Sequence, residues 1–186
     1  LIYKELPSAD GTLQSVAVSL KDDIFLGGDS YVSCYYPDLR KKWTLKTPSR
    51  ITAMSIDGDT LFASSIETIY LISPDGKLIN EWGPYEANSI ITSISAFGSR
   101  VAFADAGIKR VFILKKNGEV TGMIGQSDTR FIIPSPYFDI ALNKGNTLFA
   151  AYTGNRRIET LTTNGVFLEY FGEPGTAPGA FCGCCN

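Results

Sequence analysis

Three segments share a layout in which a β-rich run meets an Asp-Gly or Asn-Gly pair and a second glycine follows seven residues later. They are residues 67–83, 109–125 and 154–172, with the glycine pairs Gly76 and Gly83, Gly118 and Gly125, and Gly165 and Gly172. Asn-Gly and Asp-Gly supply the positive φ angles of tight hairpin turns, so each segment predicts two antiparallel strands. Residues 32–45 are a decayed fourth copy, with Pro-Asp-Leu at the turn.

A second pair of short strands is predicted upstream of each hairpin. The first strands lie at 15–20, 51–56, 91–97 and 138–142, and the second strands at 24–28, 61–65, 101–105 and 148–152. A four-stranded unit that recurs about every 40 residues is the signature of a β-propeller blade. Because a blade cannot bury both faces of its sheet alone, it needs neighbouring blades.

We therefore predict an all-β fold, a β-propeller of four-stranded antiparallel blades with four blades visible. Residues 1–186 are interpreted as one incomplete propeller domain. The predicted blades cover approximately residues 11–49, 50–89, 90–133 and 134–175, and residues 176–186 form a Cys-rich linker into a next blade.

Composition excludes several classes of function. The 186 residues contain no histidine, which removes Ser-His-Asp triads, histidine acid–base catalysis and histidine metal sites. The formal net charge is −2 and the Lys and Arg residues are scattered, which argues against a nucleic-acid partner. No apolar run approaches the roughly 20 residues that span a bilayer, so no transmembrane segment is predicted. The chain starts without a signal peptide, so either a leader was removed or the sequence is a fragment.

Residues 148–175 resemble the NHL repeat, whose consensus runs strand, Asp-x-x-Asn-x-Arg-Ile, strand, Gly, strand, Phe-Gly. The matching residues are Asn155, Arg157, Ile158, Gly165, Phe171 and Gly172, while Tyr152 replaces the consensus Asp. The third predicted blade keeps Asp105, Arg110 and Val111 but has Ile108 at the Asn position. The resemblance implies that Asp105, Arg110, Asn155 and Arg157 tie neighbouring loops together, which favours a scaffolding role over ligand binding at these residues.

NHL propellers usually have six blades, so the resemblance also implies a ring of about that size. Residues 172–181, GEPGTAPGAF, fit the family's linker into the next blade. Further sequence or another chain would then complete the ring; a true four-bladed ring is the remaining account. We expect the chain to belong to a larger ring or assembly.

The cysteines are the most unusual chemical feature. Cys182, Cys184 and Cys185 lie within four positions, and Cys34 is distant in sequence. They could form disulfides in an extracytoplasmic protein, periplasmic or secreted. They could instead hold zinc or an iron–sulfur cluster, although C-x-C-C is not the usual C-x-x-C spacing. The third interpretation is a structural role as small buried residues.

A propeller presents its binding surface at loops, here those between the second and third strands of each blade. The candidate binding residues in these loops are Asp29, Tyr31, Glu67, Asp105, Lys109, Asn155 and Arg156. Converging carboxylates could hold Ca²⁺, as in lactonase-type hydrolase propellers, and basic loops could bind RNA as in some NHL domains. The mixed charge of the loops and the missing histidine disfavour both alternatives.

The sequence predicts a non-catalytic protein-binding or scaffolding module of the NHL type, without a cofactor and with a protein partner. The first alternative is a redox or metal-bearing subunit that uses the C-terminal cysteines. The second alternative is a Ca²⁺-dependent hydrolase.

Overall fold

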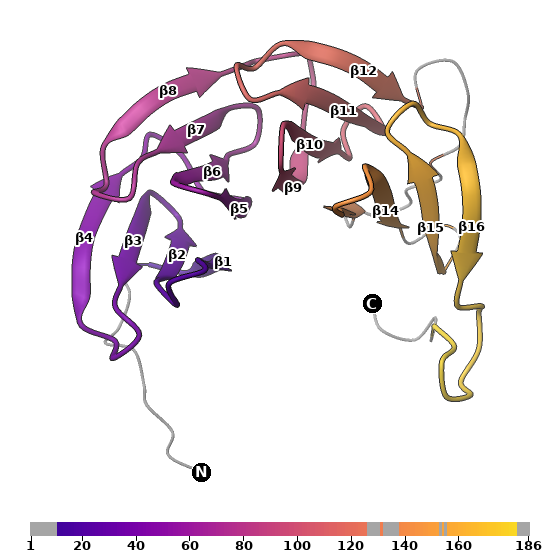
Figure 1. The fold of residues 1–186 in the computed structure, drawn as a ribbon, viewed down its shortest axis with the longest axis horizontal. Helices are drawn as coiled ribbons and strands as arrows, with labels where there is room; N and C mark the ends of the chain where they lie inside the picture. The colour runs from indigo at the N-terminus through magenta and orange to yellow at the C-terminus, as the bar shows by residue number, and fades with distance from the viewer. Residues whose placement is uncertain (1–10, 126–130, 132–137, 153, 155, 182–186) are drawn as a thin grey trace. The chain divides into compact units, whose positions relative to one another are not determined.

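The computed structural model describes residues 11–125, 131, 138–152, 154 and 156–181 (Figure 1). These residues form sixteen β-strands. The strands make four separate sheets, and each sheet contains four consecutive strands that pair antiparallel with their sequence neighbours. The all-β prediction is therefore confirmed, and we number the sheets as blades 1 to 4. Among the described residues, no helix is long and apolar enough to cross a membrane.

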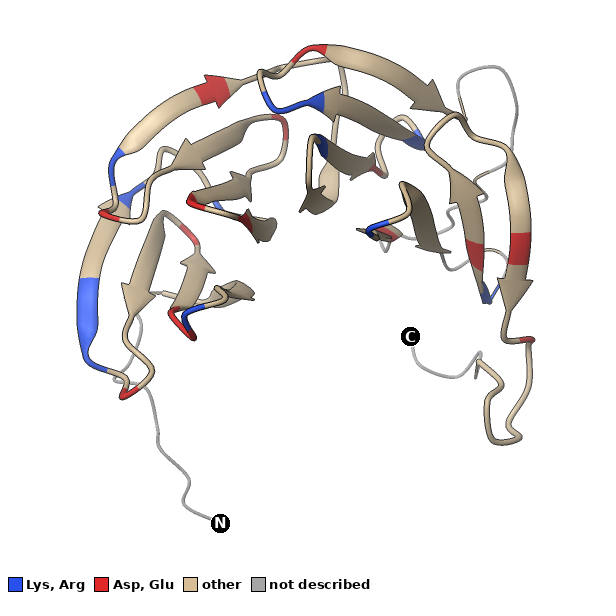
Figure 2. Ribbon diagram, in the orientation of Figure 1, with Lys and Arg blue, Asp and Glu red and all other residues tan. Residues whose placement is uncertain are grey.

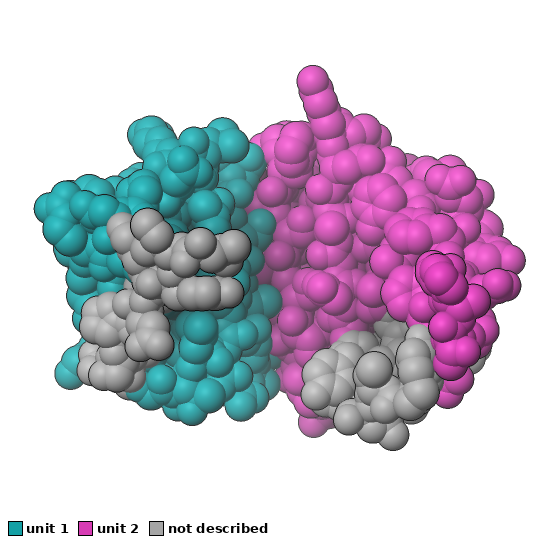
Figure 3. Space-filling view, turned by 90° about the horizontal axis from the view of Figure 1, so that it is seen from below, with its two compact units in different colours: residues 1–87 teal, residues 88–186 magenta. Residues whose placement is uncertain are grey.

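The chain divides into two compact units, residues 1–87 and 88–186 (Figure 3). The first unit contains blades 1 and 2. Blade 1 consists of β1 (Leu13–Val18), β2 (Ile24–Gly28), β3 (Tyr31–Tyr35) and β4 (Lys41–Lys46). Blade 2 consists of β5 (Ala53–Asp57), β6 (Thr60–Ser64), β7 (Ile69–Ile72) and β8 (Leu78–Trp82).

The second unit contains blades 3 and 4. Blade 3 consists of β9 (Ile91–Phe97), β10 (Arg100–Asp105), β11 (Arg110–Lys115) and β12 (Val120–Ile124). Blade 4 consists of β13 (Phe138–Leu142), β14 (Thr147–Tyr152), β15 (Arg157–Thr162) and β16 (Phe167–Phe171). Every strand falls within the blade limits expected from the sequence. That the two units make one domain stays a prediction.

The hairpin turns between the third and fourth strands share one geometry. Gly76, Gly118 and Gly165 have φ angles of 81°, 88° and 82°, and Leu39 takes the same position in blade 1 with a φ of 70°. Each donates its N–H to the carbonyl three residues earlier, at 2.9–3.0 Å. Only this one residue of each turn is left-handed, because the Asp or Asn before it has no positive φ. The turns thus belong to the hairpin loops that contain one left-handed residue.

Each fourth strand also carries a bulge at an equivalent position. The register shifts between Cys34 and Tyr35 in blade 1, and between the corresponding pairs Leu71/Ile72, Ile113/Leu114 and Thr160/Leu161 in the other blades. The extra residues, which face no partner on the third strand, are Lys42, Ile79, Thr121 and Leu168. A bulge bends the strand and increases its twist.

The two middle strands of each blade supply most of the core. All residues of β3 and β7 are buried, whereas β1 alternates between exposed and partly exposed positions. In the first unit, a cluster of buried side chains joins Phe25 and Val32 of blade 1 with Leu61 and Ala63 of blade 2. The second unit has an equivalent cluster across blades 3 and 4. Packing between blades therefore buries the faces that a single blade would leave open.

Candidate functional site

The predicted binding residues lie in the loops between the second and third strands, or at the ends of those strands. Asp29 separates β2 from β3, and Glu67 separates β6 from β7. Lys109 and Arg156 immediately precede β11 and β15. All four side chains are exposed. Asn155 lies outside the described residues.

Tyr31 differs from this group because it is buried, with 4% of its surface exposed. Its ring occupies the space beside Gly28, where an added Cβ would lie 2.1 Å from a ring carbon. The second glycine of the Gly-Gly pair at the end of β2 thus makes room for the tyrosine. Tyr31 packs inside blade 1 and is not displayed on the loop surface.

Asp105 is also buried, and its carboxylate organises the surrounding backbone. One oxygen accepts hydrogen bonds from the N–H groups of Ile90, Gly107 and Ile108 at 2.9, 3.0 and 3.2 Å. The other oxygen accepts the hydroxyl of Ser89. The carboxylate joins the segment before β9 to the loop between β10 and β11. This is a loop-scaffolding geometry, and it leaves the carboxylate occupied by protein donors.

Lys109 and Arg156 have left-handed backbones, with φ angles of 57° and 49°. Each therefore turns the chain sharply into the third strand of its blade while its side chain stays exposed. The loop residues of the first unit, Asp29 and Glu67, are acidic, whereas those of the second unit are basic. Figure 2 shows acidic and basic residues at several turns and strand ends. Among the exposed candidates, the loops of each unit therefore carry charges of one sign, whereas the buried Asp105 of the second unit is acidic.

Cys34 is a free and fully buried thiol on β3. Burial, and secondarily the nearby Asp23 carboxylate, raises the pKa of this thiol from 9.0 to about 11. The thiol stays protonated at neutral pH and is therefore a poor nucleophile and metal ligand. Cys182, Cys184 and Cys185 lie outside the described residues. In the described part of the chain, no group of three or more His, Cys, Asp or Glu residues could hold a metal ion.

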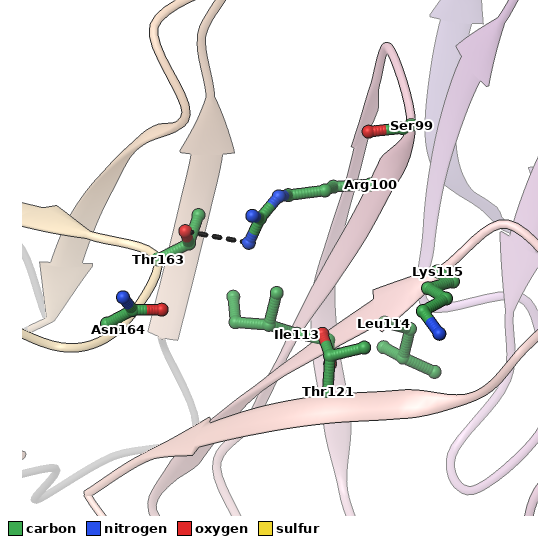
Figure 4. Close-up of a pocket in the computed structure, with 8 residues that line it drawn as sticks. All are labelled: Ser99, Arg100, Ile113, Leu114, Lys115, Thr121, Thr163 and Asn164. Atoms are coloured by element: carbon green, nitrogen blue, oxygen red, sulfur yellow. Dashed lines mark hydrogen bonds between the residues drawn. The ribbon is translucent and has the colours of Figure 1, made fainter.

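The second unit contains a pocket that the sequence did not point to. Its volume is about 470 Å³, and it lies beside the turns at the opposite edge of the sheets from the candidate loops. Figure 4 shows Arg100 extending toward Thr163 above a floor that includes Ile113. The lining residues are Ser99, Arg100, Ile113, Leu114, Lys115, Thr121, Thr163 and Asn164. One feature of the sequence could have pointed to this pocket, namely the glycine at position 122 in the fourth strand of blade 3. The fourth strands of the other three blades carry larger residues at the equivalent position, which are Trp43, Asn80 and Glu169.

Comparisons with solved structures agree with this architecture. Virginiamycin B lyase from Staphylococcus aureus superposes with a TM-score of 0.69 at 17% identity, over 89% of this chain and 57% of that one. The fold is a β-propeller. The WD40 domain of Neurospora crassa Pan2 gives a TM-score of 0.70 at 12% identity, over 89% of this chain and 51% of that one. The structure of U3-55K gives a TM-score of 0.73 at 12% identity, over 92% of this chain and 55% of that one.

The chain spans less than two thirds of the length of these structures. No protein-family model matches the chain, and no curated protein matches it either. At these levels of identity the similarity concerns the fold, since propellers host many unrelated functions.

Proposed function

We propose that the chain is a protein-binding propeller module of the NHL type that recognises its partner with the loops between the second and third strands. The observation that carries the proposal is that these loops combine buried groups, which fix the backbone, with exposed charged side chains. Buried groups such as Asp105 hold the backbone, while Asp29, Glu67, Lys109 and Arg156 are exposed. A fixed backbone lowers the entropy lost on binding, and exposed charges select the partner.

The scaffolding role of Asp105 supports the NHL resemblance, because tying loops together is what the family resemblance implies for this residue. The WD40 neighbours support a protein-interaction role at the level of the fold. Assembly with further blades, from more sequence or another chain, belongs to the same proposal.

The lyase neighbours raise an enzymatic alternative. One of these structures is described as a catalytically inactive histidine-to-alanine variant of virginiamycin B lyase with quinupristin. The 186 residues here include no histidine. We therefore do not extend lyase activity to this chain.

The test is affinity capture from an extract of the source organism, quantified by mass spectrometry, followed by titration with the purified partner. The loop variants are Lys109→Glu/Arg156→Glu and Asp29→Lys/Glu67→Lys. The matched controls are Lys144→Glu and Asp59→Lys, which change exposed residues in turns at the opposite edge of the sheets. We expect at least one loop variant to weaken partner binding about tenfold or more, as charge reversal in an interface does, while the controls bind normally. Equal partner binding by all variants would refute the proposal. Loss of the captured partner after nuclease treatment would also refute it, because the contact would then run through nucleic acid.

A further inference from the structure

The pocket of the second unit has a filled counterpart in the first unit. Trp43 on β4 faces Cys34, and Gly122 on β12 faces Ile113, at the same step of the register. The indole of Trp43 reaches the turn of blade 2, where its Nε1 donates to the Pro74 carbonyl at 2.8 Å. The ring also covers Gly76, where an added Cβ would lie 2.6 Å from a ring carbon. One indole therefore fills the space between blades 1 and 2 at this edge.

In the second unit, the space beside Gly122 is open, while Ile124 lies over the turn glycine Gly165. A Cβ added at Gly122 would meet only the Thr163 carbonyl oxygen at 3.8 Å and the Ile113 Cβ at 3.9 Å, which are ordinary contacts. Thr163 lies two residues before the turn glycine Gly165, as Pro74 lies two residues before Gly76. The Thr163 carbonyl is therefore the equivalent of the Pro74 carbonyl, which accepts the indole N–H in the first unit.

A second aromatic residue of blade 1 is also missing from blade 3. Phe25 packs against Trp43 in blade 1, with ring centroids 5.9 Å apart. The residue of blade 3 that is equivalent to Phe25 is Ala102. Phe25 pairs with Cys34 across β2 and β3, and Ala102 pairs with Ile113 across β10 and β11. Two aromatic side chains of blade 1 are thus replaced by Gly and Ala in blade 3.

The charges around the opening differ in sign from those in blade 1. There, Lys42 forms a salt bridge with Asp23 at 2.6 Å. The equivalent positions in blade 3 hold Thr121 and Arg100, so the carboxylate is replaced by a guanidinium. Arg100 donates to the Thr163 hydroxyl at 2.8 Å, and Lys115 pairs with Glu119 at 2.8 Å. Arg100 therefore contributes a cation that donates its hydrogen bond to a neutral hydroxyl.

We propose that this pocket binds a planar aromatic ring of indole size that carries a carboxylate. The ring lies beside Gly122, at the register position of Trp43 in the first unit. Its N–H donates to the Thr163 carbonyl, and Arg100 binds the carboxylate. Guanidinium groups pair well with carboxylates and stack on aromatic faces. This site lies at the opposite edge of the sheets from the proposed partner-binding loops and does not depend on them.

The test is an NMR titration of the ¹⁵N-labelled chain with indole-3-acetate. We expect shifts at Gly122, Thr163 and the Arg100 side chain, with a Kd on the order of 1 mM, as for a fragment-sized ligand. Indole without a carboxylate should bind at least about fivefold more weakly, because the ion pair with Arg100 is lost. Absence of shifts at these residues up to about ten times that concentration would overturn the proposal.

Two variants make the test specific. Gly122→Trp should abolish the shifts, since the new side chain fills the space as Trp43 does, and its spectrum should stay dispersed. Arg100→Gln should remove the preference for the carboxylate but keep weak binding of indole, and it serves as the second test if Gly122→Trp does not fold. Unchanged binding of indole-3-acetate by either variant would place the ligand elsewhere and reject the proposal.

The same chemistry occurs in a free small molecule and at the C-terminus of a peptide that ends in tryptophan. A Gly-Gly-Trp peptide and its C-terminal amide distinguish these sources. Stronger binding of indole-3-acetate than of the peptide acid supports a free ligand, whereas the reverse order supports a peptide terminus.

Discussion

Arg157 donates two hydrogen bonds to one carboxylate oxygen of Glu159, at 2.9 and 2.5 Å from its Nε and Nη2. The Glu159 side chain is 4% exposed and that of Arg157 is 33% exposed. The guanidinium also lies over the Tyr170 ring, 4.5 Å from its centre. A largely buried carboxylate on β15 thus depends on a cation that the NHL resemblance had marked as structural.

Arg157→Met should destabilise the second unit, because it removes the guanidinium that pairs with the buried Glu159 carboxylate. We expect a loss of about 2 kcal/mol, below the 3–5 kcal/mol of fully buried pairs because Arg157 is partly exposed. Urea unfolding measures the change. The control is Lys77→Met, which breaks the exposed pair with Asp75 and should change stability immeasurably. Equal effects of the two substitutions would contradict this account.

Asp105→Asn should loosen the loop between β10 and β11. An amide offers one acceptor oxygen and turns an NH₂ group toward backbone donors, so we expect a loss of about 2–3 kcal/mol. Hydrogen exchange at the Gly107 and Ile108 amides should accelerate. Asp29→Asn is the matched control, since Asp29 is exposed and its carboxylate accepts a hydrogen bond from the Thr12 N–H at 3.0 Å. Faster exchange in the control alone would argue against the scaffolding role.

The stability of the first unit should fall as the pH rises from about 9 toward 11. The unfolded Cys34 thiol ionises with a pKa near 9.0, whereas burial raises the pKa of the folded thiol to about 11. The folded state therefore binds more protons in this window, and its advantage is complete below pH 9 and is lost at higher pH. Denaturant titrations of the wild type and Cys34→Ala across the window measure the difference. The prediction fails if both proteins lose stability with the same slope, because all other titrating groups are shared.

Leu39→Gly should stabilise the turn of blade 1. Leu39 holds a left-handed backbone where the other three blades have glycine. The left-handed conformation costs an L-residue about 1–2 kcal/mol, and glycine avoids this cost. Part of the gain is lost, because glycine has a larger backbone entropy in the unfolded chain and because the burial of the leucine side chain is lost. We therefore expect the free energy of unfolding to rise by about 0.5 kcal/mol. Thermal unfolding reports the gain. The reverse change, Gly118→Ala, should destabilise by about 1 kcal/mol. A stabilising Gly118→Ala would show that φ does not control these turns.

The blades could be predicted because their signals are local. Asp-Gly and Asn-Gly pairs mark the turns, and alternating apolar residues mark the strands, so the strand positions followed. The hydrogen bonds of Asp105 agree with the loop-tying role that the resemblance to NHL repeats implies. The burial of Tyr31 could not be predicted from the sequence, because it depends on the space that Gly28 leaves for the tyrosine ring. The pocket at Gly122 required knowing which residues face one another across two blades, which the sequence spacing alone does not state. The tail cysteines stay a prediction.

The bulges of the fourth strands have a consequence for recognition. β4, β8, β12 and β16 each end their sheet, so each exposes a row of backbone donors and acceptors to which a foreign strand could add. The extra residue in each strand breaks the regular spacing of that row. A partner that docks by extending the sheet would need an uninterrupted row. Under the proposed function, selectivity therefore comes from side chains, and the outer edges of β4, β8, β12 and β16 offer an extended peptide no regular row of backbone partners.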